Sequence, residues 1–152
     1  MNDTKLEELA ARAGAQITKD RKSTVLTVSP EKVRDLFKIF KEEMPDFYHL
    51  STVSGFDEGT TITVIYHFWK GKEFLSIKTS VTKQDPTIHS ISDVVPAALL
   101  YEAEVKDMLG VKFEGNPFTR QKLILPDSYP AEAPPPLRKE ADPEKIRRMM
   151  EL

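Results

Sequence analysis

The spacing of apolar and polar positions alternates between a helical period and a strand period along the chain. Within residues 4–13, apolar side chains recur every three or four positions, and a glycine follows where a helix C-cap is expected. A second apolar stripe begins after Ser29 and Pro30 and ends before Pro45. Serine can cap free helix amides and proline fits the first turn, so this pattern predicts a second amphipathic helix.

Runs with a period of two predict five strands. Two short runs, residues 15–19 and 23–29, lie between the predicted helices and flank a polar turn. Three longer runs, residues 48–56, 60–69 and 73–81, are separated by the turn signals DEG and KGK. The order α-β-β-α-β-β-β predicts a two-layer α+β domain with a mostly antiparallel sheet and helices on one face.

After this meander the pattern changes again. A further helix is predicted from Pro96 to Leu109, closed by Gly110, and apolar groups surround most of its circumference. Such a helix needs cover on more than one side. Six of the eleven prolines then fall between Pro126 and Pro143, a density that favours extended backbone and cannot build a core.

We therefore divide the sequence into an α+β globular domain, residues 1–115, and an extended proline-rich docking arm, residues 116–152. The arm ends in a short predicted helix, capped by Asp142 and opened by Pro143. A helix of about nine residues is marginal alone in water, so it needs a surface to dock on.

Composition limits the functions that the protein can carry. It has no cysteine, which excludes thiolate metal sites, iron–sulfur ligation by its own residues and cysteine nucleophiles. The net charge of −2 argues against nucleic acid as a partner. No apolar run approaches the roughly 20 residues of a membrane-spanning helix, and the acidic N-terminus lacks the apolar stretch of a secretory signal. We expect a cytoplasmic protein that meets a membrane only through partner subunits.

Motifs for catalysis or cofactor binding are missing. The three histidines are not spaced as metal ligands, and neither a phosphate loop nor a nucleophile-elbow serine occurs. The densest ionisable cluster lies on the predicted third helix. There, we interpret Glu102 and Lys106 as an ordinary i,i+4 ion pair, and Glu104 and Asp107, three apart, as sharing a face. We expect no catalytic, cofactor-binding or metal-binding residue in this protein.

Residues 86–140 carry a series of motifs in a consistent order. The series contains two glutamates of an ERE-type triplet, then Asp-Met-x-Gly, Phe-x-Gly-x-Pro-x-x-Arg and Pro-Leu-Arg-Lys. The matching positions are Glu102, Glu104, Asp107, Met108, Gly110, Phe113, Gly115, Pro117, Arg120, Pro136, Leu137, Arg138 and Lys139. This series resembles the signature of the thirty-kilodalton subunit family of respiratory complex I, which includes the equivalent subunits of membrane-bound energy-converting nickel–iron hydrogenases and of related ferredoxin-linked complexes.

Four positions depart from the pattern of this family. Ala103 replaces the arginine of the triplet, Asn116 a histidine, Gln121 a second arginine and Glu140 an aspartate. These departures indicate a divergent branch. Together with the compact length, they favour a membrane-bound hydrogenase or ferredoxin-linked complex over an NADH–quinone oxidoreductase.

The resemblance implies a cofactor-free structural and assembly subunit in the hydrophilic arm of a membrane-bound, complex-I-like oxidoreductase. The implied partners are the large catalytic subunit and the iron–sulfur small subunit, which hold the iron–sulfur clusters and any nickel–iron centre. The protein is then part of a hetero-oligomer, peripheral on the cytoplasmic face of the cell membrane. The residues expected at the partner interface are Tyr101, Glu102, Glu104, Asp107, Arg120, Arg138 and Lys139.

Two other interpretations stay open from the sequence. In the first, the protein is a free-standing binding module whose proline-rich tail, residues 134–139, is a ligand for a polyproline-binding domain. In the second, it is a small hydrolase that uses Glu104 and Asp107 for acid–base chemistry.

Overall fold

The structure, a computed structural model, describes residues 3–21, 23–46 and 49–151. Within these residues it contains two sheets, α-helices and two short 3-10 helices, η1 and η2. In sequence order the elements are α1 (Asp3–Arg12), β1 (Gln16–Asp20), β2 (Ser23–Thr27), η1 (Pro30–Lys32), α2 (Val33–Glu43), β3 (Leu50–Asp57), β4 (Thr61–Lys70), β5 (Glu73–Thr82), β6 (Thr87–His89), α3 (Ala98–Leu109), β7 (Lys112–Glu114), η2 (Pro117–Arg120) and α4 (Pro143–Met149).

The larger sheet has the strand order β1-β2-β5-β4-β3. Its neighbouring strands are antiparallel except for β2 and β5, which run parallel because α2 and the first two meander strands intervene between them. The predicted order α-β-β-α-β-β-β and the mostly antiparallel sheet are confirmed. The first meander strand was predicted from residue 48, which lies outside the described residues; in the described part it begins at Leu50.

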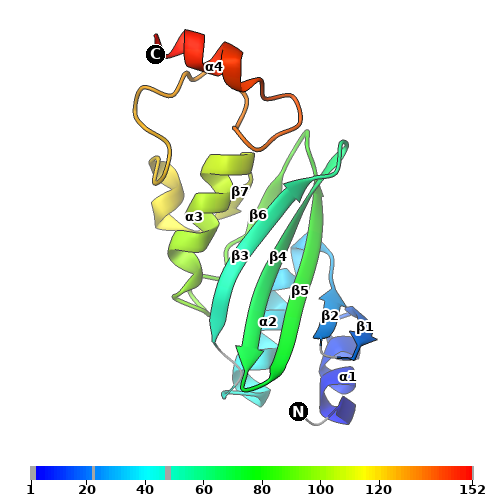
Figure 1. Cartoon of the computed structure of the whole chain (residues 1–152). Helices are drawn as coiled ribbons and strands as arrows, with labels where there is room; N and C mark the ends of the chain where they lie inside the picture. The colour runs from blue at the N-terminus through cyan, green and yellow to red at the C-terminus, as the bar shows by residue number, and fades with distance from the viewer. Residues whose placement is uncertain (1–2, 22, 47–48, 152) are drawn as a thin grey trace.

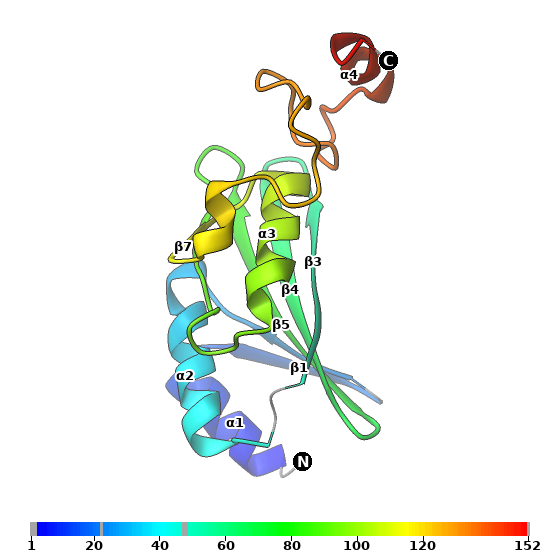
Figure 2. The same cartoon turned by 90° about the vertical axis from the view of Figure 1, so that its left-hand side faces the viewer.

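Helices α1, α2 and α3 lie on one face of this sheet, and the opposite face carries no helix of the described residues (Figures 1 and 2). The core lies between these two layers. The inward side chains of β4 alternate along the strand and are at most 2% exposed; they are Ile62, Val64, Tyr66 and Phe68. Phe37 of α2 meets Tyr66 edge to face, with ring centroids 5.2 Å apart, so aromatic packing joins the second helix to the sheet.

The helix ends follow the sequence signals with one exception. Gly14 and Gly110 adopt the left-handed backbone predicted at the ends of α1 and α3, with φ of 65° and 72°. The prediction that the Ser29 hydroxyl caps the second helix is wrong, because it makes no cap hydrogen bond. Instead the backbone first forms η1, and the Ser29 carbonyl accepts the amide of Lys32, so that α2 begins only at Val33.

The sequence patterns described above did not predict a second, two-stranded sheet. β6 pairs parallel with β7, and α3 is the crossover between them. Strands of three residues are too short to show a period of two. This pairing brings Ser90, directly after β6, and Asn116, two residues after β7, to the same side of α3, where both donate to Glu102.

Between η2 and α4 the backbone forms neither helix nor strand. It follows a series of turns closed by backbone hydrogen bonds, such as those from Tyr129 to Pro126 and from Arg138 to Pro135. The arm and α4 extend beyond one end of the sheet, opposite the end where α1 lies (Figures 1 and 2). Asp142 caps α4 as predicted, accepting two backbone amides. The domain boundary at residue 115 stays a prediction.

Gly55 sets the distance between β3 and α3. A Cβ atom at this position would lie 2.7 Å from Leu109 Cδ1 and 3.3 Å from the Thr63 carbonyl. We expect Gly55→Ala to lower the free energy of unfolding by about 1–3 kcal/mol through overpacking, measured by urea denaturation. The control is Thr52→Ala, an exposed change on the same strand, with an effect within about 0.5 kcal/mol. Equal stability of the two variants would contradict this packing.

Candidate functional site: helix α3 and the arm docked on it

Glu102 of α3 is fully buried and accepts four hydrogen bonds. Its Oε1 accepts from the Tyr66 hydroxyl at 3.3 Å and the Ile91 amide at 3.0 Å. Its Oε2 accepts from the Ser90 hydroxyl at 2.6 Å and from Asn116 Nδ2 at 2.9 Å. These donors come from β4, from the loop after β6 and from the segment after β7. The carboxylate therefore ties α3 to three separate parts of the domain.

Burial raises the pKa of Glu102, and the hydrogen bonds from Ser90, Ile91 and Asn116 offset part of that effect. The predicted ion pair between Glu102 and Lys106 is wrong. Lys106 Nζ lies instead 3.0 Å from Asp107 Oδ1 and 3.1 Å from the Gln121 carbonyl. The reason is the rotation of α3, which turns Glu102 into the core and leaves Lys106 beside the arm.

Asp107 holds the start of the arm against α3. Its side chain is buried, and Oδ2 accepts the consecutive backbone amides of Leu123, Ile124 and Leu125 at 2.7, 2.7 and 3.2 Å. Burial opposes ionisation of Asp107, but the hydrogen bonds from Ile124, Lys106 and Leu123 outweigh it and lower the pKa. An ionised carboxylate is thus the acceptor for three amides that the arm offers.

Glu104 and Asp107 are three positions apart on α3, as expected, but their surroundings differ. Glu104 is exposed, whereas Asp107 is buried and its oxygens are occupied by the arm and by Lys106. Two carboxylates in such different surroundings are not placed to act together on one substrate. This arrangement argues against the hydrolase interpretation.

Asp57, at the end of β3, holds a later part of the arm. Its Oδ2 accepts from Lys83 Nζ at 2.7 Å and from the Lys139 amide at 2.9 Å, while Oδ1 accepts from the Gly59 amide. Lys83 also lies 2.6 Å from Glu140 Oε2. The contact with Lys83, followed by that with Lys139, holds the pKa of Asp57 well below its ordinary value. The sequence indicated Asp57 only as a turn residue.

The C-terminal end of α3 receives two further donors from the arm. The Leu137 amide donates to the Met108 carbonyl at 2.9 Å, and Arg138 Nε donates to the Leu109 carbonyl at 2.7 Å. Carbonyls in the last turn of a helix have no partner within the helix, so a cation suits this position. Gly110 allows the approach, because a Cβ there would lie 3.0 Å from the Arg138 guanidinium.

Between these attachment points the arm is closed by its own contacts. Lys122 Nζ donates to the carbonyls of Pro126, Asp127 and Tyr129 at 3.3, 3.1 and 3.0 Å. The Tyr129 hydroxyl donates to the Pro134 carbonyl at 2.6 Å. An ammonium group surrounded by three carbonyls makes this segment a folded loop attached at both ends to the domain.

The residues expected at a partner interface fall into two groups. The exposed or half-buried group is Tyr101, Glu104, Arg120 and Lys139. The second group, Glu102, Asp107 and Arg138, makes hydrogen bonds inside the protein. Contact of either group with a partner stays a prediction. Asp57, Ser90 and Asn116 were missed as structural partners, because no local pattern marks a contact made across the fold.

Large apolar side chains are exposed on the same elements. Within the described residues, five lie on α3 or on segments that contact it, and they are 37–59% exposed. These five, which we call the α3–arm surface, are Leu100, Phe118, Leu123, Ile124 and Leu137. Large exposed apolar side chains on neighbouring segments are a feature of many protein–protein interaction sites.

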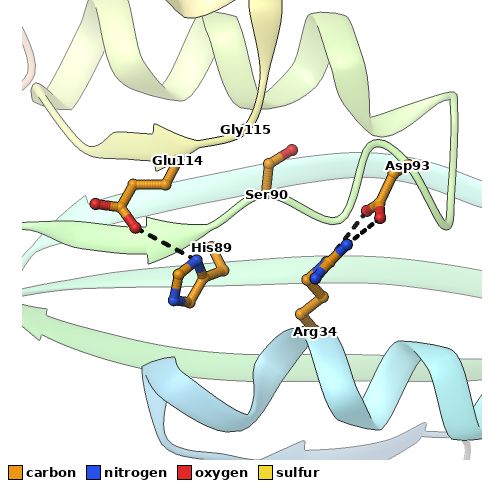
Figure 3. Close-up of a pocket in the computed structure, with 6 residues that line it drawn as sticks. All are labelled: Arg34, His89, Ser90, Asp93, Glu114 and Gly115. Carbon is orange, nitrogen blue, oxygen red and sulfur yellow. Dashed lines mark hydrogen bonds and ion pairs between the residues drawn. The ribbon is translucent and has the colours of Figure 1, made fainter.

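A cleft of about 300 Å³ lies between α2 and the paired ends of β6 and β7. Figure 3 shows its ionisable side chains as two pairs, Arg34 with Asp93 and His89 with Glu114. His89 Nδ1 lies 3.3 Å from Glu114 Oε2. Each basic group faces an acidic one, so the cleft is a poor site for an anion.

The described part of the protein lacks two other kinds of feature. In that part of the protein, the side chains of histidine, aspartate and glutamate nowhere form a group of three or more that could hold a metal ion. None of its helices is both long and apolar enough to cross a membrane.

The fold and its contacts define a two-layer α+β domain with a C-terminal arm docked on its own third helix. The sequence matches the family described as "Respiratory-chain NADH dehydrogenase, 30 Kd subunit" over residues 26–147. The protein therefore belongs to that family, and the resemblance seen in the motifs is confirmed.

Curated relatives of two kinds match. The NADH-quinone oxidoreductase C subunit of Geobacter sulfurreducens is 30% identical over 86% of this sequence and 88% of the relative. Membrane-bound hydrogenase subunit beta of Pyrococcus furiosus is 30% identical over 72% of this sequence and 65% of the relative. The NADH-quinone oxidoreductase C subunit of Salinispora tropica is 28% identical, and the matched part of this sequence spans about half of that relative, 54%.

Solved structures show the same fold. One polypeptide of the membrane-bound sulfane sulfur reductase, an archaeal respiratory membrane complex, aligns with a TM-score of 0.77 at 23% identity, over 99% of this protein and 91% of that polypeptide. A trypsin-resistant fragment of Nqo5 aligns with a TM-score of 0.56 at 24% identity, over 77% of this protein and 98% of that fragment.

The attachment at Asp107 gives a direct prediction. Asp107→Asn keeps the shape of the side chain but removes the charge that three amides share, and hydrogen bonds to a charged group contribute about 1.5–3 kcal/mol. We expect hydrogen exchange at Leu123 to Leu125 to accelerate about tenfold or more, and trypsin to cleave faster after Lys122. Glu104→Gln, the same type of change on the exposed side of α3, is the control and should leave both rates unchanged.

The lowered pKa values of Asp57 and Asp107 also predict a pH dependence. Their contribution to stability is complete above the ordinary carboxyl pKa of about 4 and is lost as the pH falls through their lower folded-state values. Protection of the arm amides should therefore decrease from pH 5 to pH 2. In Asp57→Asn/Asp107→Asn this decrease should be smaller, and an unchanged pH profile would contradict the role of the two carboxylates.

Proposed function

We propose that this protein is a structural and assembly subunit of a membrane-bound, complex-I-like oxidoreductase. In this proposal it carries no cofactor and docks on the large catalytic subunit through the α3–arm surface. The observation that supports it best is that five exposed apolar side chains lie on a helix and an arm already held together by buried carboxylates. Membership of the thirty-kilodalton subunit family supports the same assignment.

The fixed arm has an energetic consequence for docking. Ordering a free segment at an interface costs conformational entropy for each residue. Here that cost is met during folding, by the hydrogen bonds to Asp107, Asp57 and the end of α3. The apolar side chains on the arm are thereby presented in a defined arrangement, and their burial contributes directly to affinity.

The proposal assigns all redox centres to partner subunits. Because the protein has no cysteine, iron–sulfur clusters and any nickel–iron centre belong to the large catalytic subunit and the iron–sulfur small subunit. The complex meets the cytoplasmic face of the membrane through other subunits. The motif departures lead us to favour a membrane-bound hydrogenase or ferredoxin-linked complex. Sequence identity does not separate the two kinds, because a relative of each kind is 30% identical.

The free-standing binding module is less well supported. A polyproline ligand must present a free extended segment to its receptor. In this protein Leu137, Arg138 and Lys139 donate hydrogen bonds to Met108, Leu109 and Asp57 of the same molecule. Binding to a receptor would have to compete with these contacts.

Replacing two side chains of the α3–arm surface tests the proposal. We expect Leu100→Ser/Leu137→Ser to reduce co-purification of the large catalytic subunit with the tagged protein at least tenfold, since each exposed leucine buries apolar area on docking. The variant should unfold at the wild-type temperature, because both side chains are exposed. Ala11→Ser, an exposed apolar-to-polar change on α1, which lies on neither proposed surface, is the control and should retain that subunit. Full retention by the double variant would contradict the proposal.

A further inference from the structure

A second exposed surface lies on the side of the sheet that carries no described helix (Figure 1). Trp69 of β4 and Phe74 of β5 are a cross-strand pair at one end of this face, 47% and 54% exposed. Phe56 of β3, which is 43% exposed, pairs with Thr63 toward the other end. Aromatic side chains thus occupy both ends of an open sheet face.

The part of this face formed by β3, β4 and β5 carries few charges. Three positions of β3, five of β4 and five of β5 alternate onto it, and Lys78 is the only charged residue among them. The Glu58 carboxylate also reaches this part of the face and accepts from the Thr63 hydroxyl, and the strand register continues the face onto β2 and β1, where Asp20 is charged. Charged residues make up 30% of the whole sequence. Apart from Ile65, His67 and Lys78, the positions on β3, β4 and β5 hold serine, threonine or aromatic residues. Depletion of charge with enrichment of tryptophan and phenylalanine is the composition found in the centre of protein interfaces.

The polar groups in the middle of this face are largely satisfied by one another. His67 lies between two serines, with Nε2 2.8 Å from Ser54 Oγ and Nδ1 3.1 Å from Ser76 Oγ. The Thr63 hydroxyl is 2.7 Å from that of Ser80. Partial burial lowers the pKa of His67, which keeps the ring neutral near pH 7. Polar groups that already have hydrogen-bond partners lose little free energy when water is removed, so a partner can cover this face at a small desolvation cost.

The positive charge of Lys78 limits which kind of partner surface can cover this sheet face. It lies at the centre of the face, paired in register with Ile65, and its ammonium makes no ion pair with any residue that the structure describes. A wholly apolar cover would leave this charge buried without a partner, at a large cost in free energy. A complementary surface therefore combines few charges with one carboxylate placed against Lys78.

We propose that this open sheet face binds a second subunit of the same complex, through a charge-poor segment that carries an acidic residue opposite Lys78. The inference rests on the proposed function only in placing the protein within a multi-subunit complex. The α3–arm surface belongs to the layer of helices, whereas this face lies on the other side of the sheet (Figure 2). The protein then joins two neighbours, with its sheet between them.

Photo-crosslinking in the purified, assembled complex tests the inference. A benzoylphenylalanine placed at Phe74 should crosslink to a charge-poor segment of one subunit, and one placed at Leu137 should crosslink to a different subunit. In addition, Lys78→Glu should reduce at least tenfold the amount of the subunit crosslinked from position 74 that is retained in the purified complex, whereas Lys78→Arg should leave that amount unchanged. The melting temperatures of the isolated Lys78 variants should match that of the wild type.

Several outcomes overturn the inference. They are a crosslink from position 74 to a second copy of this protein or to lipid, no crosslink from that position, and unchanged subunit retention in Lys78→Glu. If position 137 crosslinks to the large subunit while position 74 reaches no other subunit, this inference fails and the proposed function stands. If the protein co-purifies with no oxidoreductase subunit, the proposed function fails as well.

Discussion

The buried carboxylate of Glu102 constrains the rest of this structure. Helix α3 is apolar around most of its circumference, so hydrophobic burial alone does not define its rotation. A fully buried carboxylate without hydrogen bonds is prohibitively unstable, and its four donors come from Tyr66, Ser90, Ile91 and Asn116. Only one rotation of α3 lets Glu102 accept all four hydrogen bonds, and in that rotation Asp107 faces the arm and Leu100 faces outward.

The same principle attaches the arm. A proline-rich segment has few amides to donate and little apolar area to bury, so burial alone does not hold it in place. Buried aspartates supply what it lacks, because one ionised oxygen of Asp107 accepts three arm amides and one of Asp57 accepts the Lys139 amide. The arm is therefore part of the fold, and its exposed side chains extend the surface of α3. On the opposite side, the sheet presents a nearly neutral, aromatic face, which gives the proposed subunit two distinct places for neighbours.

Much of the fold followed from local patterns. Periodicity predicted the first two helices, the five strands of the larger sheet and α3, and glycines at positions 14 and 110 marked helix ends that are left-handed in the structure. The motif series predicted the family that the comparison confirmed. The predictions failed where local chemistry had two outcomes. Glu102 and Lys106 are spaced for an ion pair, yet Glu102 makes its hydrogen bonds in the core and Lys106 donates to the arm. Strand β6, with three residues, is too short to show a period of two.

By itself, the sequence determined the order of the helices and of the five strands in the larger sheet, the absence of cysteine chemistry and the family, because these depend on residue types at short, fixed spacings. Only the tertiary structure decided which acidic residues of α3 are internal, that Asp57 holds the arm 82 positions further along the sequence, and that Arg138 caps a helix of its own molecule. The physical reason is that a hydrogen bond across the fold depends on helix rotation and strand pairing, which the whole core sets together. No stretch of neighbouring residues contains that information.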